Sequence, residues 1–242
     1  MSMAIFSKNH VSIYYEDSGE DLPAVLLLAP GGMKSSLDFW NHTPWDPRKE
    51  LSRNYRVIAM DQRNAGRSTA PVMPQDGWHN YIEDQLALMD HLGIDKFNIA
   101  GMCIGGPYCL GIIDAAPGRV ITATIFQTIG LDNNREAFYQ LFDEWAFEVG
   151  SRDSTISPEV FDAFRTNMFG PSDVFFNLNE SFLPTCNTPL LVLMGDDLFH
   201  PKSTSELIVE KAPIAQLIKS WKTGEARESA ILECRQFLDL HN

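Results

Sequence analysis

Residues 97–106 of this chain read Phe97-Asn98-Ile99-Ala100-Gly101-Met102-Cys103-Ile104-Gly105-Gly106. The first part is an apolar run that predicts a buried strand, and the residues that follow predict an apolar helix ending near Ala116. The turn between them must bring strand and helix close together, which requires residues with almost no side chain. Glycines at 101, 105 and 106 meet that requirement. Cys103 is therefore expected in a strained turn just before a helix N-terminus.

Cys103 has two interpretations. Cysteine is among the most buried residue types, so a cysteine after a strand is often only part of the core. At a helix N-terminus, however, the unpaired N–H groups and the helix dipole favour a thiolate and lower the thiol pKa from its free value of about 8.5. A Gly-x-Cys-x-Gly-Gly turn between strand and helix has the layout of a nucleophile elbow, with cysteine in place of the usual serine. The pattern favours a nucleophilic Cys103.

Apolar runs that suit strands covered on both faces occur on either side of this stretch. Segments with helical periodicity, such as 83–92 and 203–212, separate them. Alternation of this kind predicts an α/β fold with a mainly parallel sheet and helices on both faces. The predicted strands are 11–15, 23–29, 55–60, the run that begins at Phe97, 119–126, 189–194 and 216–221.

The alternation stops at about Leu131, and aromatic residues are frequent from there to Cys186. We interpret this segment as an inserted helical cap between two parts of one core. Aromatic residues at helical spacing are most often a packing face. So many of them beside the Cys103 turn nevertheless favour an apolar pocket roof, and Phe142 and Trp145 are its candidate lining residues. The predicted division of the chain is 1–130, 131–186 and 187–242.

Composition excludes several classes of protein. A chain of 242 residues with 44% hydrophobic residues can bury a sizeable core, and its formal charge of −13, without a basic cluster, is expected to repel nucleic acid. Its four cysteines are scattered, so neither a disulfide framework nor a zinc site is indicated. The first six residues lack the features of a signal peptide, and no apolar run approaches about 18 residues. A soluble cytoplasmic protein without a membrane partner is expected.

Three further features accompany the elbow: Pro30-Gly31-Gly32 after an earlier strand, the cap, and Gly195 to Pro201 after a later strand. Together they resemble the α/β-hydrolase superfamily over essentially the whole chain. The cysteine elbow is most similar to those of dienelactone hydrolases and polyhydroxyalkanoate synthases. The loop at 61–68 and the cap position resemble capped esterases, lactonases and haloperoxidase-like proteins. The resemblance implies an α/β-hydrolase fold and an enzyme with no metal or organic cofactor.

The same resemblance assigns roles to individual residues. Cys103 takes the nucleophile position. The backbone N–H groups of Ile104 and Gly32 take the oxyanion-hole positions, where fixed donors face the oxygen that becomes negative during acyl transfer. Met33 is the next available donor if the turn is shifted by one residue, and it is also a candidate for the substrate pocket. A tight turn without catalytic function is the alternative for the glycine pair.

The resemblance places Asp197 in the acid position, four residues before Pro201, with the adjacent Asp196 as its rival. Two neighbouring aspartates cannot both enter one small pocket without raising the pKa of one of them. We favour Asp197 because of its spacing to the proline.

The histidine departs from the family pattern. The base is expected on the loop after the last strand, here 222–227, and that loop contains no histidine. His200, three residues beyond Asp197, is the best substitute. Two alternatives remain open: His200 is a surface residue preceding a helix, or the site has no histidine base. In the second case a thiolate can still be acylated, but hydrolysis of the thioester needs an activated water molecule.

The sequence thus predicts a hydrolase that uses Cys103 to cleave a small-molecule ester, lactone or thioester with a hydrophobic acyl part. Two alternatives stay open. One is acyl transfer or carbon–carbon bond cleavage at the same site, and the other is a non-catalytic protein that binds a small ligand. Since the fold serves many functions, Cys103 reactivity is what separates them. The oligomeric state is also open, with a homodimer as one option.

Overall fold

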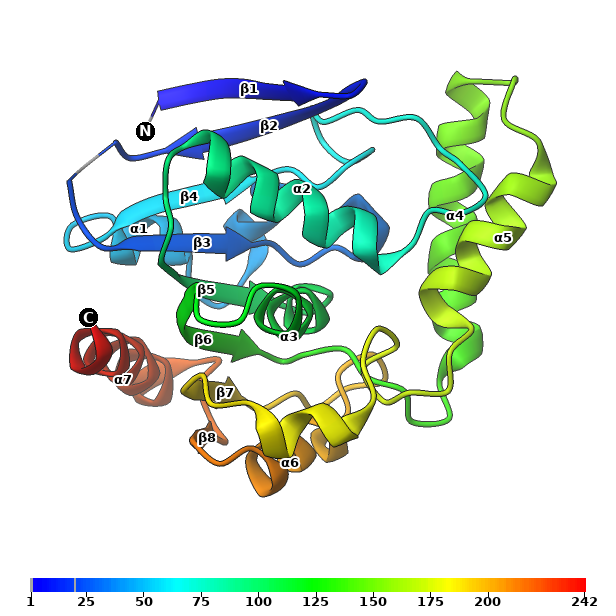
Figure 1. The fold of residues 1–242 in the computed structure, drawn as a ribbon. Coiled ribbons are helices and arrows are strands. Elements are labelled where there is room, and N and C mark those ends of the chain that lie inside the picture. The colour runs from blue at the N-terminus through cyan, green and yellow to red at the C-terminus, as the bar shows by residue number, and fades with distance from the viewer. Residues whose placement is uncertain (1, 20) are drawn as a thin grey trace.

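The computed structural model describes residues 2–19 and 21–242. Within these residues, eight strands form one sheet in the order β1-β2-β4-β3-β5-β6-β7-β8 (Figure 1). Strand β2 is antiparallel to both of its neighbours, and all the other neighbouring strands are parallel. The strands are β1 (Ser2–Lys8), β2 (Val11–Asp17), β3 (Ala24–Leu28), β4 (Arg56–Met60), β5 (Phe97–Met102), β6 (Val120–Phe126), β7 (Leu190–Leu193) and β8 (Ala215–Ile218).

Helices cover both faces of this sheet, which confirms the predicted fold class. Successive strand residues point to opposite faces. Leu26 and Leu28 of β3 accordingly join one hydrophobic cluster with α2, α3 and α6, while Val25 and Leu27 join a second cluster with α1 and α7. The helices of the core are α1 (Pro47–Leu51), α2 (Trp78–His91), α3 (Gly105–Ala115), α6 (Lys202–Lys211) and α7 (Gly224–His241).

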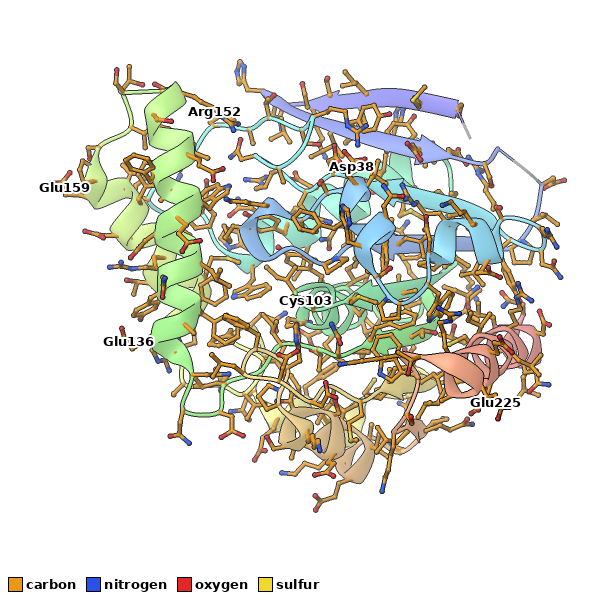
Figure 2. All side chains as sticks on the ribbon, turned by 180° about the vertical axis from the view of Figure 1, so that it is seen from behind. Asp38, Cys103, Glu136, Arg152, Glu159 and Glu225 are labelled. Atoms are coloured by element: carbon orange, nitrogen blue, oxygen red, sulfur yellow. The ribbon has the colours of Figure 1, made fainter. Side chains whose placement is uncertain are left out.

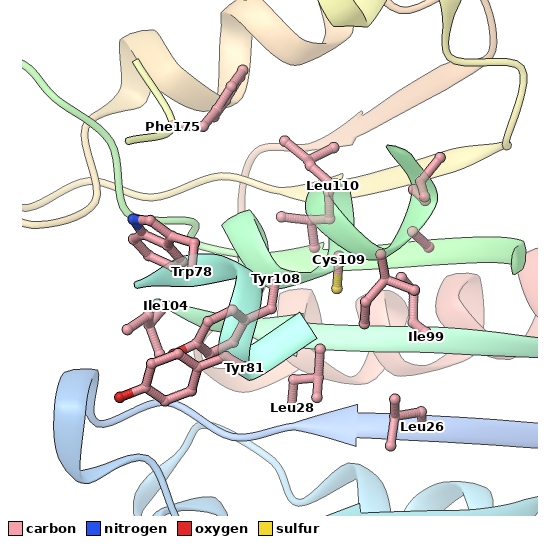
Figure 3. Packing of buried hydrophobic residues seen from close by; sticks show 14 of the residues in the cluster. Leu26, Leu28, Trp78, Tyr81, Ile99, Ile104, Tyr108, Cys109, Leu110 and Phe175 are labelled. Atoms are coloured by element: carbon pink, nitrogen blue, oxygen red, sulfur yellow. The ribbon is translucent and has the colours of Figure 1, made fainter. Parts of the chain in front are cut away.

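Aromatic stacking fixes α3, the helix that follows Cys103, against α2. The rings of Tyr81 and Tyr108 stack with centroids 5.3 Å apart, and Trp78 meets Tyr108 edge-on at 5.3 Å. Figure 3 shows these three side chains packed together, with Ile104 near them and Cys109 on the same helix. This buried contact holds the start of α3, and with it Cys103, on a rigid part of the core.

Two long helices between β6 and β7 stand beyond the carboxyl ends of the parallel strands (Figure 1). They are α4 (Arg135–Arg152) and α5 (Pro158–Phe169), and the short 3-10 helix η3 (Glu180–Thr185) follows them. Their position places them over the sheet edge at which β5 ends. The division of the chain into a core at 1–130 and 187–242 and a cap at 131–186 stays a prediction.

The structure differs from the sequence prediction at three elements. Strand β1 was not predicted, because its hairpin turn uses Asn9 and His10, both with positive φ, without the glycine that usually marks such a turn. Helix α2 begins at Trp78, five residues earlier than expected, and β8 ends at Ile218 rather than at Trp221.

Candidate active site

Cys103 occupies a strained turn between β5 and α3, as predicted. Its φ is +62°, a left-handed backbone conformation that residues other than glycine rarely adopt. Its N–H donates to the carbonyl of Phe126 at 3.1 Å, and its own carbonyl accepts from Gly106 at 3.1 Å. A Cβ on Gly101 would overlap the Gly105 carbonyl, and a Cβ on Gly105 would overlap the carbonyl of Leu28 in β3. The helix therefore approaches β5 and β3 this closely only because both residues are glycines. In Figure 2, Cys103 lies at the centre of the molecule, between the sheet and α4.

His200 and Asp197 form a pair within one tight turn after β7. Nδ1 of His200 lies 2.7 and 2.8 Å from the two carboxylate oxygens of Asp197. Oδ1 of Asp197 also accepts the backbone N–H groups of Phe199 and His200, both at 3.0 Å. Burial by itself would raise the pKa of Asp197, but these donors hold it below its ordinary value. The neighbouring Asp196 forms an exposed ion pair with Lys222 instead.

Cys103 and His200 shift each other's pKa. Burial by itself would raise the pKa of the Cys103 thiol, but His200 and the backbone N–H groups of Gly31 and Ile104 lower it below its ordinary value. Burial would likewise lower the pKa of His200, yet Cys103 and Asp197 raise it to about 9. Nε2 of His200 is buried and makes no hydrogen bond of regular geometry. The directions of the two shifts favour the thiolate form of Cys103 and the imidazolium form of His200.

Two backbone donors flank the sulfur, one from each of the predicted turns. Ile104 follows Cys103 and Gly31 belongs to the turn after β3; the N–H groups of both residues lower the pKa of the Cys103 thiol. Gly31 has a φ of +119°, and a Cβ there would lie 2.8 Å from the Phe39 ring. Gly32 and Met33 begin the 3-10 helix η1 (Gly32–Lys34) at the same place. The assignment of Gly32 and Ile104 to an oxyanion hole stays a prediction, to which the structure adds Gly31.

A cavity of about 230 Å³ opens beside Cys103. Except for Cys103, His200 and backbone atoms, the residues around it are apolar. Met33 lines it as predicted, and it is roofed from α4 by Phe138 and Leu141. The lining residues are Gly31, Gly32, Met33, Cys103, Ile104, Ile129, Phe138, Leu141, Phe169, Phe199 and His200.

The prediction that Phe142 and Trp145 line the pocket is wrong. Both point between α4 and α5: the Phe142 ring meets Phe164 at 5.3 Å, and the Trp145 ring meets Phe164 at 5.6 Å. Nε1 of Trp145 donates to the carbonyl of Asn64, which tethers α4 to the core. Helical spacing identified a buried face of α4, but the cavity is lined by Phe138 and Leu141 on the same helix.

The family model for the alpha/beta hydrolase fold matches residues 24–166. The chain belongs to the α/β-hydrolase fold family. Over 121 residues it is 34% identical to the dihydrolipoyllysine-residue acetyltransferase component of the acetoin cleaving system of Pseudomonas putida, covering 49% of this chain and 30% of that protein. Over 230 residues it is 25% identical to the bifunctional esterase/perhydrolase DCH of Acinetobacter calcoaceticus, covering 80% and 81%.

Solved α/β-hydrolase structures match nearly the whole chain. The enol-lactonase from Burkholderia xenovorans LB400 superposes with a TM-score of 0.69 at 18% identity, covering 98% of this chain and 100% of that one. This similarity extends the shared fold beyond the region matched by the family model, to the strands and helices at both ends of the chain.

In this α/β-hydrolase the last strand, β8, is followed by Trp221, close to the loop on which the family pattern has its histidine. Trp221 is 1% exposed, its Nε1 donates to the carbonyl of Met194 at 2.9 Å, and its ring packs against Phe126. It therefore fills the interior beneath the β7 turn.

Within the described residues, no three His, Cys, Asp or Glu side chains are grouped as a metal site would require. No helix in the described part of the chain is both long and apolar enough to cross a membrane.

Iodoacetamide should alkylate Cys103 before the other three cysteines, with a pH midpoint below about 8.5. Thiolates are the reactive form. The pKa of Cys103 is lowered, whereas burial raises the pKa values of Cys109, Cys186 and Cys234. Peptide mapping after partial labelling at pH 6.5–9 measures both order and midpoint. Labelling of another cysteine first, or a midpoint of 8.5 or higher for Cys103, would show that no activated thiolate is present.

Proposed function

We propose that this α/β-hydrolase hydrolyses small uncharged esters, lactones or thioesters, with Cys103 as nucleophile and His200, held by Asp197, as acid and base. The observation that carries the proposal is the arrangement of three residues: Asp197 binds Nδ1 of His200, and His200 and Cys103 line the same cavity and shift each other's pKa. The esterase and lactonase names of the relatives support the same class of bond.

The acylation step follows from the protonation states. The pKa of His200 is raised to about 9 and that of Cys103 is lowered, so the pair favours an imidazolium and a thiolate, the forms from which the reaction starts. The thiolate attacks the carbonyl carbon, and the carbonyl oxygen takes the electron pair of the C=O bond. The N–H groups of Gly31 and Ile104 stabilise this oxyanion. When the intermediate collapses, the bond to the leaving oxygen breaks and His200 gives that oxygen its proton. The products are an alcohol and a thioester on Cys103.

Deacylation reverses the role of His200. The sulfur of the thioester is neutral, so the interaction with the thiolate no longer raises the pKa of His200. The neutral imidazole then accepts a proton from water while the water oxygen attacks the thioester carbonyl. When the carbon–sulfur bond breaks, the thiolate returns and the pair with the imidazolium forms again. Asp197 keeps Nδ1 of His200 protonated throughout, so that Nε2 faces the reaction.

The cavity limits the acyl group in both size and charge. At about 30 Å³ for each water-sized atom, a volume of about 230 Å³ holds roughly eight non-hydrogen atoms. A hexanoyl or benzoyl group is of that size. Among the residues that line the cavity, His200 is the one cationic side chain, and Asp197 already pairs with it. Because Asp197 already pairs with His200, a carboxylate on the substrate would be buried without a partner.

With p-nitrophenyl esters, kcat/KM should rise from acetyl to hexanoyl and fall again by decanoyl. The increase reflects burial of about 0.8 kcal/mol per methylene, and the fall reflects the size of the cavity. The adipoyl monoester, which matches hexanoyl in length but ends in a carboxylate, should react at least about tenfold more slowly. Initial rates at fixed ionic strength measure this series. A flat trend, or equal rates for the hexanoyl and adipoyl esters, would contradict the proposed substrate class.

A further inference from the structure

The turn that carries Asp197 and His200 is held in place through its backbone. Nε1 of Trp221 donates to the carbonyl of Met194 at 2.9 Å, and the N–H of Gly195 donates to Oγ of Ser205 at 3.2 Å. Both contacts fix the beginning of the turn, where it leaves β7. They leave the far side of the turn, next to His200, to another contact.

Asn134 supplies that contact from the start of α4. Its Nδ2 donates to the carbonyl of Leu198 at 2.7 Å. Leu198 is 60% exposed, so apolar burial at this position does little to hold the turn. Leu198 lies between Asp197 and His200 in the sequence. A hydrogen bond to its carbonyl therefore holds the backbone that joins these two residues.

Asn134 is itself rigid. It is 4% exposed, its Nδ2 also donates to the carbonyl of Gly130 at 3.0 Å, and its Oδ1 accepts the N–H of Asp132 at 2.9 Å. Both ends of the amide are thus satisfied in one orientation, which is the situation in which a buried polar group specifies a unique geometry. The segment that leaves β6 and the turn that leaves β7 are joined at this amide.

We propose that Asn134 is a positioning residue that holds His200 against Cys103. The proposal rests on the function proposed above. Asn134 does not line the cavity and contacts neither the sulfur nor the imidazole. Its effect passes through the Leu198 carbonyl to the Asp197–His200 pair. Since His200 lowers the pKa of Cys103, any movement of the turn changes the reactivity of the thiol.

Asn134→Ala should lower kcat by about 10- to 100-fold and change KM little, because misplacement of a catalytic group by about 1 Å can cost a factor of this size. It should also move the pH midpoint of Cys103 alkylation upward, toward about 8.5. Asn167→Ala is the matched control. Nδ2 of Asn167 also donates to two backbone carbonyls, those of Pro74 and Asp76, but these belong to the segment before α2 and not to the turn of His200. In that variant kcat should stay within about twofold of the wild-type value, and the pH midpoint of Cys103 alkylation within about 0.2 pH units.

A purely structural role for Asn134 gives a different result. The variant would then melt at a lower temperature, but its folded fraction would keep the wild-type alkylation midpoint, and that outcome overturns the proposal. If Asn134→Ala does not fold, Asn134→Ser replaces it, because serine is also favoured at the start of a helix but its hydroxyl is too short to bridge to Leu198. Alkylation does not require turnover. A wild-type protein without esterase activity, whose alkylation midpoint still moves in the variant, would refute the proposed function and retain the positioning role.

Discussion

Replacement of Cys103 by alanine is expected to reduce ester turnover by about 10⁴-fold or more. The variant loses the atom that forms the covalent bond, and neither the backbone donors nor His200 can supply another nucleophile. Because alanine fits the same turn without new contacts, the fold should remain intact. Initial rates with p-nitrophenyl hexanoate, measured together with the melting temperature, test this expectation.

Cys186→Ala is the control for Cys103→Ala. Cys186 is also a free cysteine, but it is buried beside η3, away from the cavity. Its replacement should leave kcat/KM within about twofold. If Cys103→Ala keeps more than a few per cent of the wild-type rate, a different residue or a bound water acts as nucleophile, and the assignment of Cys103 is wrong.

His200→Ala is expected to give a burst of about one product per enzyme followed by a stalled state. The thiolate can still be acylated, particularly above the ordinary thiol pKa of about 8.5, but no group remains to activate water. Steady-state turnover should fall by about 10²–10⁴-fold, the range for loss of a general base. Stopped-flow absorbance with an activated ester separates the burst from the steady state. Wild-type turnover in this variant would exclude His200 as the base.

Substitutions of the two neighbouring aspartates, Asp196 and Asp197, test whether the contact with His200 controls the rate. Asp197→Asn removes the charge that orients the imidazole, and should cause a large loss in kcat. Asp196→Asn removes a charge that only pairs with Lys222 on the surface, and should change kcat by less than about twofold. Equal effects of the two substitutions would show that charge near the site, rather than the contact with His200, controls the rate.

The sheet and the elbow could be predicted because their signals are local. Runs such as Leu26 to Leu28 are apolar at every position, and only a strand covered on both faces buries all of them. The turn at Cys103 requires glycine at positions set by a few neighbouring residues. By contrast, no glycine marks the turn between β1 and β2, and the predicted strand at 11–15 was not sufficient to indicate that another strand precedes it.

The site could be predicted only where its residues lie close together in sequence. Asp197 and His200 occupy one turn, so their pairing follows from a separation of three residues. The approach of His200 to Cys103, nearly 100 residues earlier, depends on how the turn leaves β7. It also depends on contacts from Asn134 and Trp221, whose role no sequence pattern indicates.

The pocket shows the limit of periodicity. The spacing of Phe138, Phe142 and Trp145 correctly indicates that one face of α4 is buried. It does not specify what each residue packs against: α5 and the core take Phe142 and Trp145, and Phe138 alone of the three reaches the cavity. The sequence favours the N–H of Gly32 as the donor from the turn after β3, with that of Met33 as the alternative, whereas the N–H of Gly31 is the one that acts on Cys103. This depends on how the turn is rotated, which adjacent glycines leave undetermined.

Intact-protein mass spectrometry of His200→Ala, after a short incubation with p-nitrophenyl hexanoate, tests the central claim most directly. The account predicts a mass increase of one hexanoyl group, mapped by peptide sequencing to Cys103 and released by hydroxylamine. Pretreatment with iodoacetamide should prevent it. Acylation at another residue, or no mass increase although product is released at the wild-type rate, would contradict a covalent mechanism through Cys103.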